Sequence, residues 1–118
     1  MTKAAARAGH RSSLRGQVAI IGIGLSPVGR VPGRSPLWLA ACAARQALAD
    51  AGLQKSEIDG VLAGHAMAVP FHRFSVAFSE YFGVQPTFSN TLQVSGATAA
   101  TQFNIAAAAI HGGLADTV

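Results

Sequence analysis

The sequence predicts an α/β fold built around a mainly parallel sheet, and three observations support this prediction. Short apolar runs alternate with longer segments of helical periodicity, in the order β-α-β-α-β-α-β. The first run, residues 18–23, is apolar throughout, which is typical of a strand buried on both faces of a parallel sheet. Strands that alternate with helices favour parallel pairing through right-handed crossovers. We therefore expect one sheet with helices packed against its faces.

The first predicted helix has a clear beginning and end. A loop rich in Gly and Pro spans residues 24–33, after which Ser35 can cap the helix and Pro36 can occupy its first position. Gly52 is placed to end the helix as its C-cap. One helical face collects the apolar residues Leu37, Ala41, Ala44, Leu48 and Ala51. Cys42 lies beside this face, so we expect a packed structural thiol.

Two further strands and an aromatic helix are predicted in the middle of the chain. Residues 61–63 form a short second strand, and residues 87–92 form a third. Between them, aromatic residues recur at helical spacing and stop at Gly83; they are Phe71, Phe74, Phe78, Tyr81 and Phe82. Such a stripe indicates a core or a subunit interface.

The third predicted helix, residues 95–111, is rich in alanine and carries almost no charge. A helix that is apolar all round is expected to be buried on nearly all sides. Residues 116–118 then begin what resembles a fourth strand. We expect the chain to be the front portion of a longer protein, with a disordered basic leader over residues 1–16 and a truncated N-terminal domain over residues 17–118.

Composition limits the classes of function. Half of the residues are apolar and 12% are charged, which indicates a globular protein. The net charge of +4 is concentrated before Asp50, the first acidic residue. This pattern suits a nucleic-acid-binding arm, an organellar presequence or a polar leader on an enzyme. Because no aromatic residue interleaves the basic ones, we favour the leader and expect no nucleic-acid partner.

Other classes of site are disfavoured by spacing. No apolar run is long enough for a membrane span. The histidines lack compact ligand spacing, so we expect no metal. The lone Cys42 excludes an internal disulfide and fits a reducing compartment, so we expect a cytoplasmic location. Gly22 and Gly24 suggest a dinucleotide fingerprint, but Pro27 stands where its third glycine belongs and no acidic residue follows at the expected distance.

Three stretches together resemble the thiolase superfamily, and its sterol-carrier or lipid-transfer branch in particular. They read "VAIIGIG…SPVGR", "AARQALADAGLQKSEIDGVLAG" and "QVSGATAATQFNIAAAAIHGGLADTV". The resemblance covers residues 17–118. It implies a thiolase-like fold, of which this chain would be the front portion of the first half, with dimers formed around the third strand.

The resemblance also implies where the chemistry would lie. In thiolases a Cys-x-Ser-Gly motif opens the third helix, and its thiolate accepts the acyl group. Counting back from Gly96 and Ser95 places Gln93 at the cysteine's position, and a slip of one residue would place Val94 there. The nucleophile is absent in both cases. Gln93 would serve as an amide donor or acceptor near a thioester carbonyl, or as a packed amide that caps the third helix.

Three interpretations of function remain open. The first is a thiolase-like enzyme of lipid or sterol side-chain metabolism that acts on acyl-CoA thioesters, as an acyltransferase or by cleaving carbon–carbon bonds. The second is a non-catalytic subunit that binds acyl-CoA or a partner protein. The third is an inactive truncated fragment. The resemblance implies a homo-oligomer, or a hetero-oligomer with an accessory acyl-CoA-binding protein. No cofactor is expected beyond the coenzyme A of the substrate.

Overall fold

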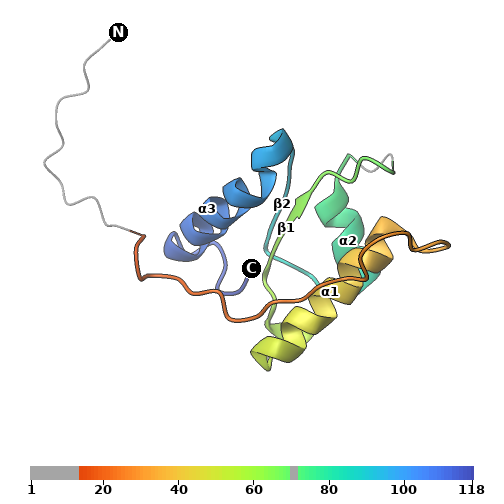
Figure 1. Cartoon of the computed structure of the whole chain (residues 1–118). Coiled ribbons are helices and arrows are strands. Elements are labelled where there is room, and N and C mark those ends of the chain that lie inside the picture. The colour runs from red at the N-terminus through yellow and green to blue at the C-terminus, as the bar shows by residue number, and fades with distance from the viewer. Residues whose placement is uncertain (1–13, 70–71) are drawn as a thin grey trace, which may run out of the picture.

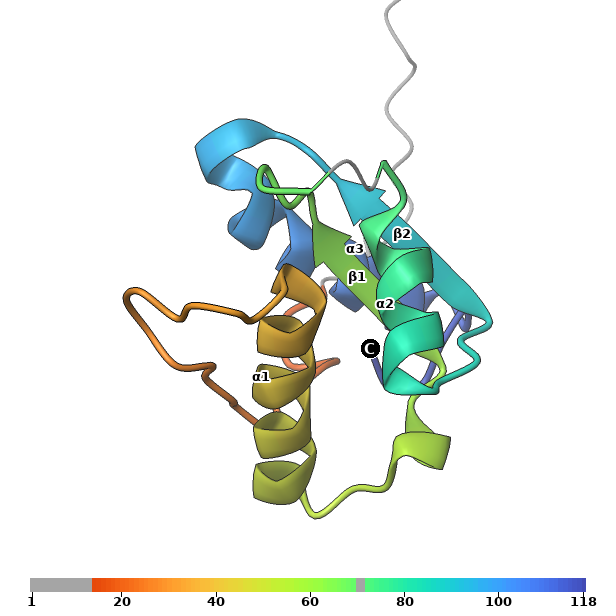
Figure 2. The same ribbon diagram turned by 90° about the vertical axis from the view of Figure 1, so that its right-hand side faces the viewer.

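A two-stranded parallel sheet lies between helices in the computed structural model, which describes residues 14–69 and 72–118. The elements follow the order α1 (Pro36–Ala51), β1 (Gly60–Gly64), α2 (Phe74–Phe82), β2 (Phe88–Leu92) and α3 (Thr98–His111). Short 3-10 turns, η1 (Lys55–Glu57) and η2 (Ser95–Ala97), precede β1 and α3. Helix α3 covers one face of the sheet, and α1 and α2 cover the other (Figures 1 and 2). The predicted α/β class with parallel strands is confirmed.

The two strands pair in register from Gly60 opposite Phe88 to Gly64 opposite Leu92. One further bond, from the His65 N–H to the Leu92 carbonyl at 3.2 Å, continues the pairing beyond β1. Because the strands are parallel, their carboxyl ends meet at one edge of the sheet. The residues that follow them, His65 and Gln93, are thereby brought to the same end of the molecule.

Helix α1 forms as its sequence predicts. The Ser35 hydroxyl accepts a hydrogen bond from the Trp38 N–H at 3.1 Å, and Pro36 occupies the first helical position. Gly52 ends the helix with a φ of 70°, a left-handed conformation that favours glycine. Ala41 is fully buried on the predicted apolar face. It belongs to a core between α1, α2 and β1, together with Val61, Phe82 and Val84.

The aromatic stripe on α2 is only partly buried. Phe74 and Phe82 are buried, and the Phe78 and Phe82 rings stack with centroids 5.2 Å apart. Tyr81 is 48% exposed, so it does not belong to the core of this chain, and its place in a subunit interface stays a prediction. Phe71 lies outside the described residues. The inward side of this helix is therefore made of the phenylalanines spaced four residues apart, Phe74, Phe78 and Phe82.

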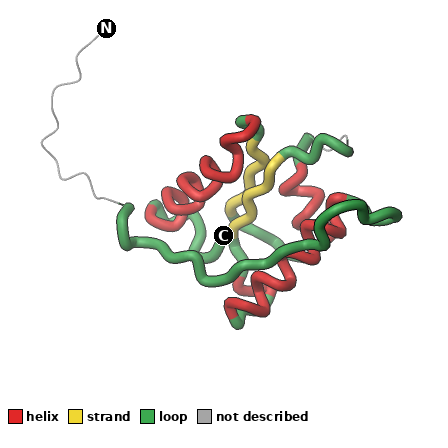
Figure 3. The backbone as a smooth tube through the Cα atoms, viewed as in Figure 1, coloured by secondary structure: helices red, strands yellow, loops and turns green. Residues whose placement is uncertain are grey.

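The predicted first strand, residues 18–23, is wrong as a strand. These residues are extended, but they belong to a long segment without helix or strand that runs along α1 (Figure 3). Two backbone N–H groups at the end of this segment bond to side chains of α1 instead. The Ile23 N–H donates to Asp50 Oδ2 at 2.9 Å, and the Leu25 N–H donates to Gln46 Oε1 at 3.2 Å. Ile23 is 70% exposed, so the predicted burial on both faces is also wrong.

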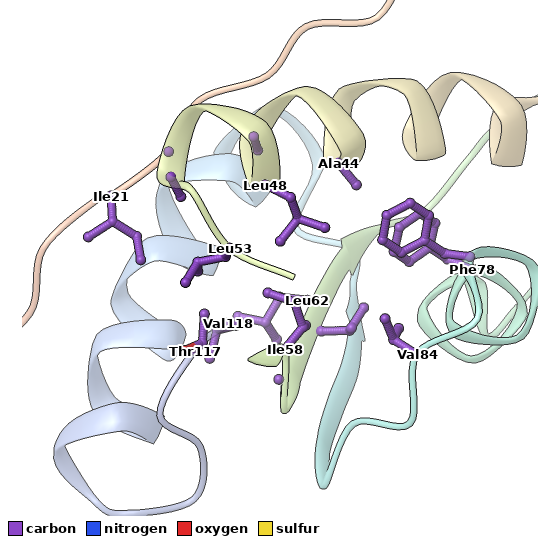
Figure 4. Close-up of a pocket in the computed structure, with 16 residues that line it drawn as sticks. Ile21, Ala44, Leu48, Leu53, Ile58, Leu62, Phe78, Val84, Thr117 and Val118 are labelled. Carbon is purple, nitrogen blue, oxygen red and sulfur yellow. The ribbon is translucent and has the colours of Figure 1, made fainter. Parts of the chain in front are cut away.

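Two glycines let this segment approach α1 closely. A Cβ atom added at Gly24 would lie 1.9 Å from the Ala43 carbonyl oxygen. A Cβ atom added at Gly22 would lie 2.3 Å from the Ala47 carbonyl oxygen. The Gly22-Ile23-Gly24 pattern is therefore explained by packing of backbone against backbone, in which no larger residue fits. An apolar cavity of about 210 Å³ lies beside this contact, between Ile21, Leu48 and Val118 (Figure 4).

The predicted fourth strand, residues 116–118, is also not a strand among the described residues. It nevertheless bonds to the beginning of β1: the N–H groups of Asp59 and Gly60 donate to the Thr117 carbonyl at 3.2 and 2.9 Å. The Asp59 carboxylate accepts from the N–H groups of Thr117 and Asp116 at 2.8 Å. The Asp59 carbonyl accepts from the N–H groups of Thr87 and Phe88. Asp59 thus joins three segments at the amino ends of both strands.

We expect the Asp59 carboxylate to make folding stability depend on pH. Hydrogen bonds from the backbone N–H of Thr117, and then of Asp116, hold the pKa of Asp59 below its ordinary value of 3.8. A lowered pKa in the folded state contributes stability that is present above the unfolded pKa and is lost as the pH falls through the folded pKa. The Asp59→Asn variant should be less stable by about 1 kcal/mol at pH 6, because hydrogen bonds to a charged acceptor are stronger.

Urea unfolding of both proteins between pH 6 and pH 3 checks this expectation. The difference between the wild type and Asp59→Asn should shrink as the pH falls below about 4. Parallel pH profiles would show that Asp59 does not stabilise the fold as a carboxylate.

The burial expected for α3 is wrong for the described part of the chain. Ala109 is buried, at 3% exposed, but Phe103 is 61% exposed. The surface of α3 is apolar and uncharged as predicted, but no described residue covers the side that carries Phe103. Within the described ranges, no helix has the length and apolar character needed to cross a membrane.

Candidate functional site

A cleft of about 870 Å³ opens at the carboxyl ends of β1 and β2. Gly64 and His65 contribute from the end of β1, Met67 from the following loop, and Gln93 from the residue directly after β2. The turn that begins α3 completes the lining with Ser95, Gly96, Thr98, Ala99 and Gln102. The carboxyl edge of a parallel sheet, next to a helix N-terminus, is where open α/β folds place their ligands.

The turn between β2 and α3 is held by one hydroxyl. Thr98 Oγ1 accepts from the Val94 N–H at 3.1 Å and donates to the Ser95 carbonyl at 2.8 Å. Ser95 has a φ of 52°, in the left-handed region that non-glycine residues seldom adopt. Such a conformation costs free energy and persists only where the surrounding structure holds it. Residues in such conformations cluster at functional sites.

Gln93 lies where the sequence predicts it, at the corner between β2 and α3. Its side chain is exposed and lines the cleft. It does not cap the helix: neither η2 nor α3 has a side-chain cap at its N-cap residue, and the nearby polar bonds belong to Thr98. The interpretation of Gln93 as a packed capping amide is therefore wrong. Its amide remains available to a ligand.

The direction of β2 into the cleft is fixed from the other side of the sheet. Thr91 Oγ1 accepts from the Ser75 N–H at 2.9 Å, so it caps α2 in place of the N-cap residue Arg73, whose side chain makes no cap bond. Thr91 also donates to Ser75 Oγ at 2.9 Å. Ser75 is buried, which makes this a satisfied internal network. The network holds the strand two residues before Gln93.

The cleft residues that were not identified from the sequence include His65, Met67 and Gln102. His65 carries the only ionisable side chain among the described residues that line the cleft, and Met67 is 86% exposed at its rim. A signal for two of them was present. His65 follows the second predicted strand directly, and parallel strands end at a shared edge. Gln102 lies four residues after Thr98, on the same helical face.

The remaining candidates lie elsewhere. Cys42 is partly buried in α1 and does not line the cleft. No group of three or more His, Cys, Asp or Glu side chains that could hold a metal ion occurs in residues 14–69 and 72–118. The cleft thus presents amide, imidazole and hydroxyl groups. These groups can bind and polarise a carbonyl oxygen, and no described thiol is placed to attack one.

The fold is similar to that of thiolase-like proteins of the sterol-carrier type. The chain superimposes with a TM-score of 0.65 on a monomeric SCP2-thiolase-like protein type 1 from Mycobacterium smegmatis, at 21% identity over 81% of this chain and 21% of that one. This similarity shows the fold. No family model matches the chain.

Two further proteins are more similar in sequence to this chain. It is 38% identical over 106 residues to the 17-hydroxy-3-oxo-4-pregnene-20-carboxyl-CoA lyase of Mycobacterium tuberculosis strain ATCC 25618 / H37Rv. These residues make up 89% of this chain and 26% of the lyase. It also matches the Ltp2-ChsH2(DUF35) aldolase with a TM-score of 0.68 and 32% identity, over 82% of this chain and 25% of that one. The predicted resemblance is confirmed. The chain spans about a quarter of the length of these relatives.

Proposed function

We propose that this chain provides the thioester-binding corner of a thiolase-like lyase that cleaves a carbon–carbon bond in an acyl-CoA of sterol side-chain metabolism. The observation that carries the proposal is Gln93, an exposed amide in a cleft with no described thiol, at the corner where the resemblance predicts the thiolase cysteine. The relatives support it, because one is named as a lyase of a steroid carboxyl-CoA and another as an aldolase.

The proposed reaction is a retro-aldol cleavage of a β-hydroxyacyl-CoA. A base removes the hydroxyl proton, the bond between the α and β carbons breaks, and its electron pair moves into the thioester as an enolate. The β carbon leaves as a carbonyl compound, and the enolate takes a proton at its α carbon. Gln93 would donate a hydrogen bond to the thioester oxygen, whose negative charge grows as the bond breaks. No acyl group is transferred to the protein in this scheme.

The polar turn would support that role. Gln93 precedes η2 and α3, and the N-terminus of a helix carries a partial positive charge. The left-handed Ser95 and the Thr98 hydroxyl fix the turn that follows Gln93. A donor held in place before the reaction begins stabilises a developing charge more than a mobile one, because little reorganisation is needed.

We also infer that the protein works with other subunits. The aldolase relative is named as an assembly of Ltp2 with ChsH2(DUF35), which supports a second polypeptide. Among the described residues, β2 pairs only with β1, so its other edge can accept a strand from a second copy. The thiolase-like relative from Mycobacterium smegmatis is monomeric by its name, so a dimer is not general to the fold. Native mass spectrometry of the purified protein would count the subunits.

We expect no acyl-enzyme to form on this chain. The protein, purified at its native length with any subunit that accompanies it, should release a shortened CoA ester from a β-hydroxyacyl-CoA. Intact mass spectrometry after incubation with octanoyl-CoA should show no adduct on residues 89–96. Alkylation of Cys42 by iodoacetamide after unfolding serves as the control that a modified thiol is detected.

The outcomes separate the interpretations of function. An acyl adduct on residues 89–96 would contradict the proposed mechanism. Tight acyl-CoA binding without cleavage would favour a non-catalytic subunit. Absence of both binding and cleavage would contradict the proposal that the cleft receives a thioester.

A further inference from the structure

Gln102 has an amide group without a partner at the base of the cleft. It lies on α3, one turn after Thr98, and lines the cleft with Thr98 and Ala99. Its Nε2 atom lies over the end of β1, 4.0 Å from the position of a Cβ atom added at Gly64. The Gln102 amide therefore lies where the sheet edge and the helix N-terminus meet.

This amide nitrogen is exceptional among the described residues. It is the only buried side-chain nitrogen or oxygen there that makes no hydrogen bond. Other buried or partly buried polar side chains have hydrogen-bond partners: Thr91 donates to Ser75 Oγ, and the Ser79 hydroxyl donates to the Ser75 carbonyl. Buried polar groups are nearly always hydrogen-bonded, so an unpaired donor that lines a cleft calls for an acceptor from outside the protein.

The surroundings define the chemistry of that acceptor. The cleft contains no Lys or Arg, which disfavours a phosphate, and its neutral donors suit a neutral oxygen. Met67 at the rim offers apolar contact to a hydrocarbon chain. The terminal amide of glutamine turns with little cost about its last side-chain bond, so either end can face the cleft.

We propose that Gln102 is a substrate-binding residue whose amide donates a hydrogen bond to the carbonyl oxygen of the bound acyl thioester. This inference rests on the proposed function, because it takes the ligand of the cleft to be an acyl-CoA. It assigns to the thioester oxygen a donor on α3 in addition to Gln93, which precedes the helix. The two amides reach the cleft from different elements, and a carbonyl oxygen has two lone pairs to accept both.

The test compares two probes that differ only at the carbonyl group. Octanoyl-CoA has the thioester oxygen, and its thioether analogue S-octyl-CoA has a methylene in its place. The Gln102→Met variant keeps the length of the side chain and removes its donor. At native length, it should bind octanoyl-CoA about tenfold more weakly than the wild type and bind S-octyl-CoA equally well in titration calorimetry.

A stability measurement separates binding from a structural role. The thermal midpoint of Gln102→Met should stay the same or rise, because an unpaired buried polar group is replaced by an apolar one of similar size. A structural role predicts a fall. The same change at Gln85, which is exposed and outside the cleft, should alter neither the midpoint nor the affinity for either probe.

The outcomes distinguish this inference from the proposed function. If the wild type binds octanoyl-CoA and Gln102→Met weakens both probes equally or neither, Gln102 does not bind the carbonyl oxygen, and the proposed function still stands. A lowered midpoint in Gln102→Met would also overturn the inference. If the wild type binds neither probe, the proposed function and the inference both fail.

Discussion

Replacing Gly24 with alanine is expected to destabilise the protein by about 2–4 kcal/mol. The new Cβ atom would lie 1.9 Å from the Ala43 carbonyl oxygen and 2.5 Å from the Ala47 nitrogen. Both are backbone atoms of α1, so no side chain can rotate to make room. Residues 22–25 would have to move away from the helix.

That movement would also break the two hydrogen bonds that hold the segment to α1, from the Ile23 N–H to Asp50 and from the Leu25 N–H to Gln46. The thermal midpoint of the Gly24→Ala protein should fall by roughly 10–20 °C. Gly96→Ala is the matched control, because Gly96 has no atom within 4 Å of the added Cβ and no left-handed φ. Equal midpoints for the two variants would show that the close approach to α1 does not stabilise the fold.

Replacing Gln93 with methionine is expected to lower kcat for carbon–carbon cleavage by about 10²–10³-fold, with a much smaller change in KM. Removal of one donor to a developing oxyanion has an effect of this size, because the bond strengthens as charge grows in the transition state. Gln93→Met keeps the shape of the side chain and removes its hydrogen bonds. Since Gln93 is exposed and caps no helix, stability should change little.

The comparison again uses Gln85→Met, which removes a glutamine outside the cleft and should keep wild-type kcat. Steady-state rates of CoA-ester release at native length supply the measurement. An unchanged kcat in Gln93→Met would refute a role of Gln93 in the reaction.

The helices could be predicted from sequence because their signals are local. Ser35, Pro36 and Gly52 mark the ends of α1, and each acts on backbone groups within a few residues of itself. The strands β1 and β2 were also found, within one residue at each end. An apolar run predicts an extended segment, and β1 and β2 each have the other as a pairing partner.

Residues 18–23 and 116–118 show the limit of such reasoning. Their composition is that of strands, but a strand also needs a continuous ladder of hydrogen bonds to a neighbouring strand. Residues 18–23 have no strand beside them among the described residues, and residues 116–118 accept bonds from the start of β1 only at the Thr117 carbonyl. The error on α3 has the same origin. An apolar surface can be read from Phe103 and the surrounding alanines, whereas the partner that covers it is a long-range property.

The sequence predicted the position of Gln93 in the candidate site, but it did not predict which other residues line the cleft. Gln93 could be placed because the turn after a strand and before a helix is a local pattern. His65 and Gln102 reach the same cleft only through the pairing of β1 with β2 and the packing of α3. The Gly22-Ile23-Gly24 pattern shows the converse case, since its explanation is a helix that begins twelve residues later.

The position of Asp59 has a consequence for local opening of the sheet. At the amino ends of the strands, Asp59 makes several bonds of 2.8–3.0 Å to backbone N–H groups of two other segments. At the carboxyl ends, the last described bond between the strands is the single contact of 3.2 Å from His65 to Leu92. We therefore expect fluctuations that separate the strands to begin at the cleft and to become smaller toward Asp59. A ligand held between His65 and Gln93 would close that end, so its binding would slow amide exchange at the cleft and leave exchange near Asp59 unchanged.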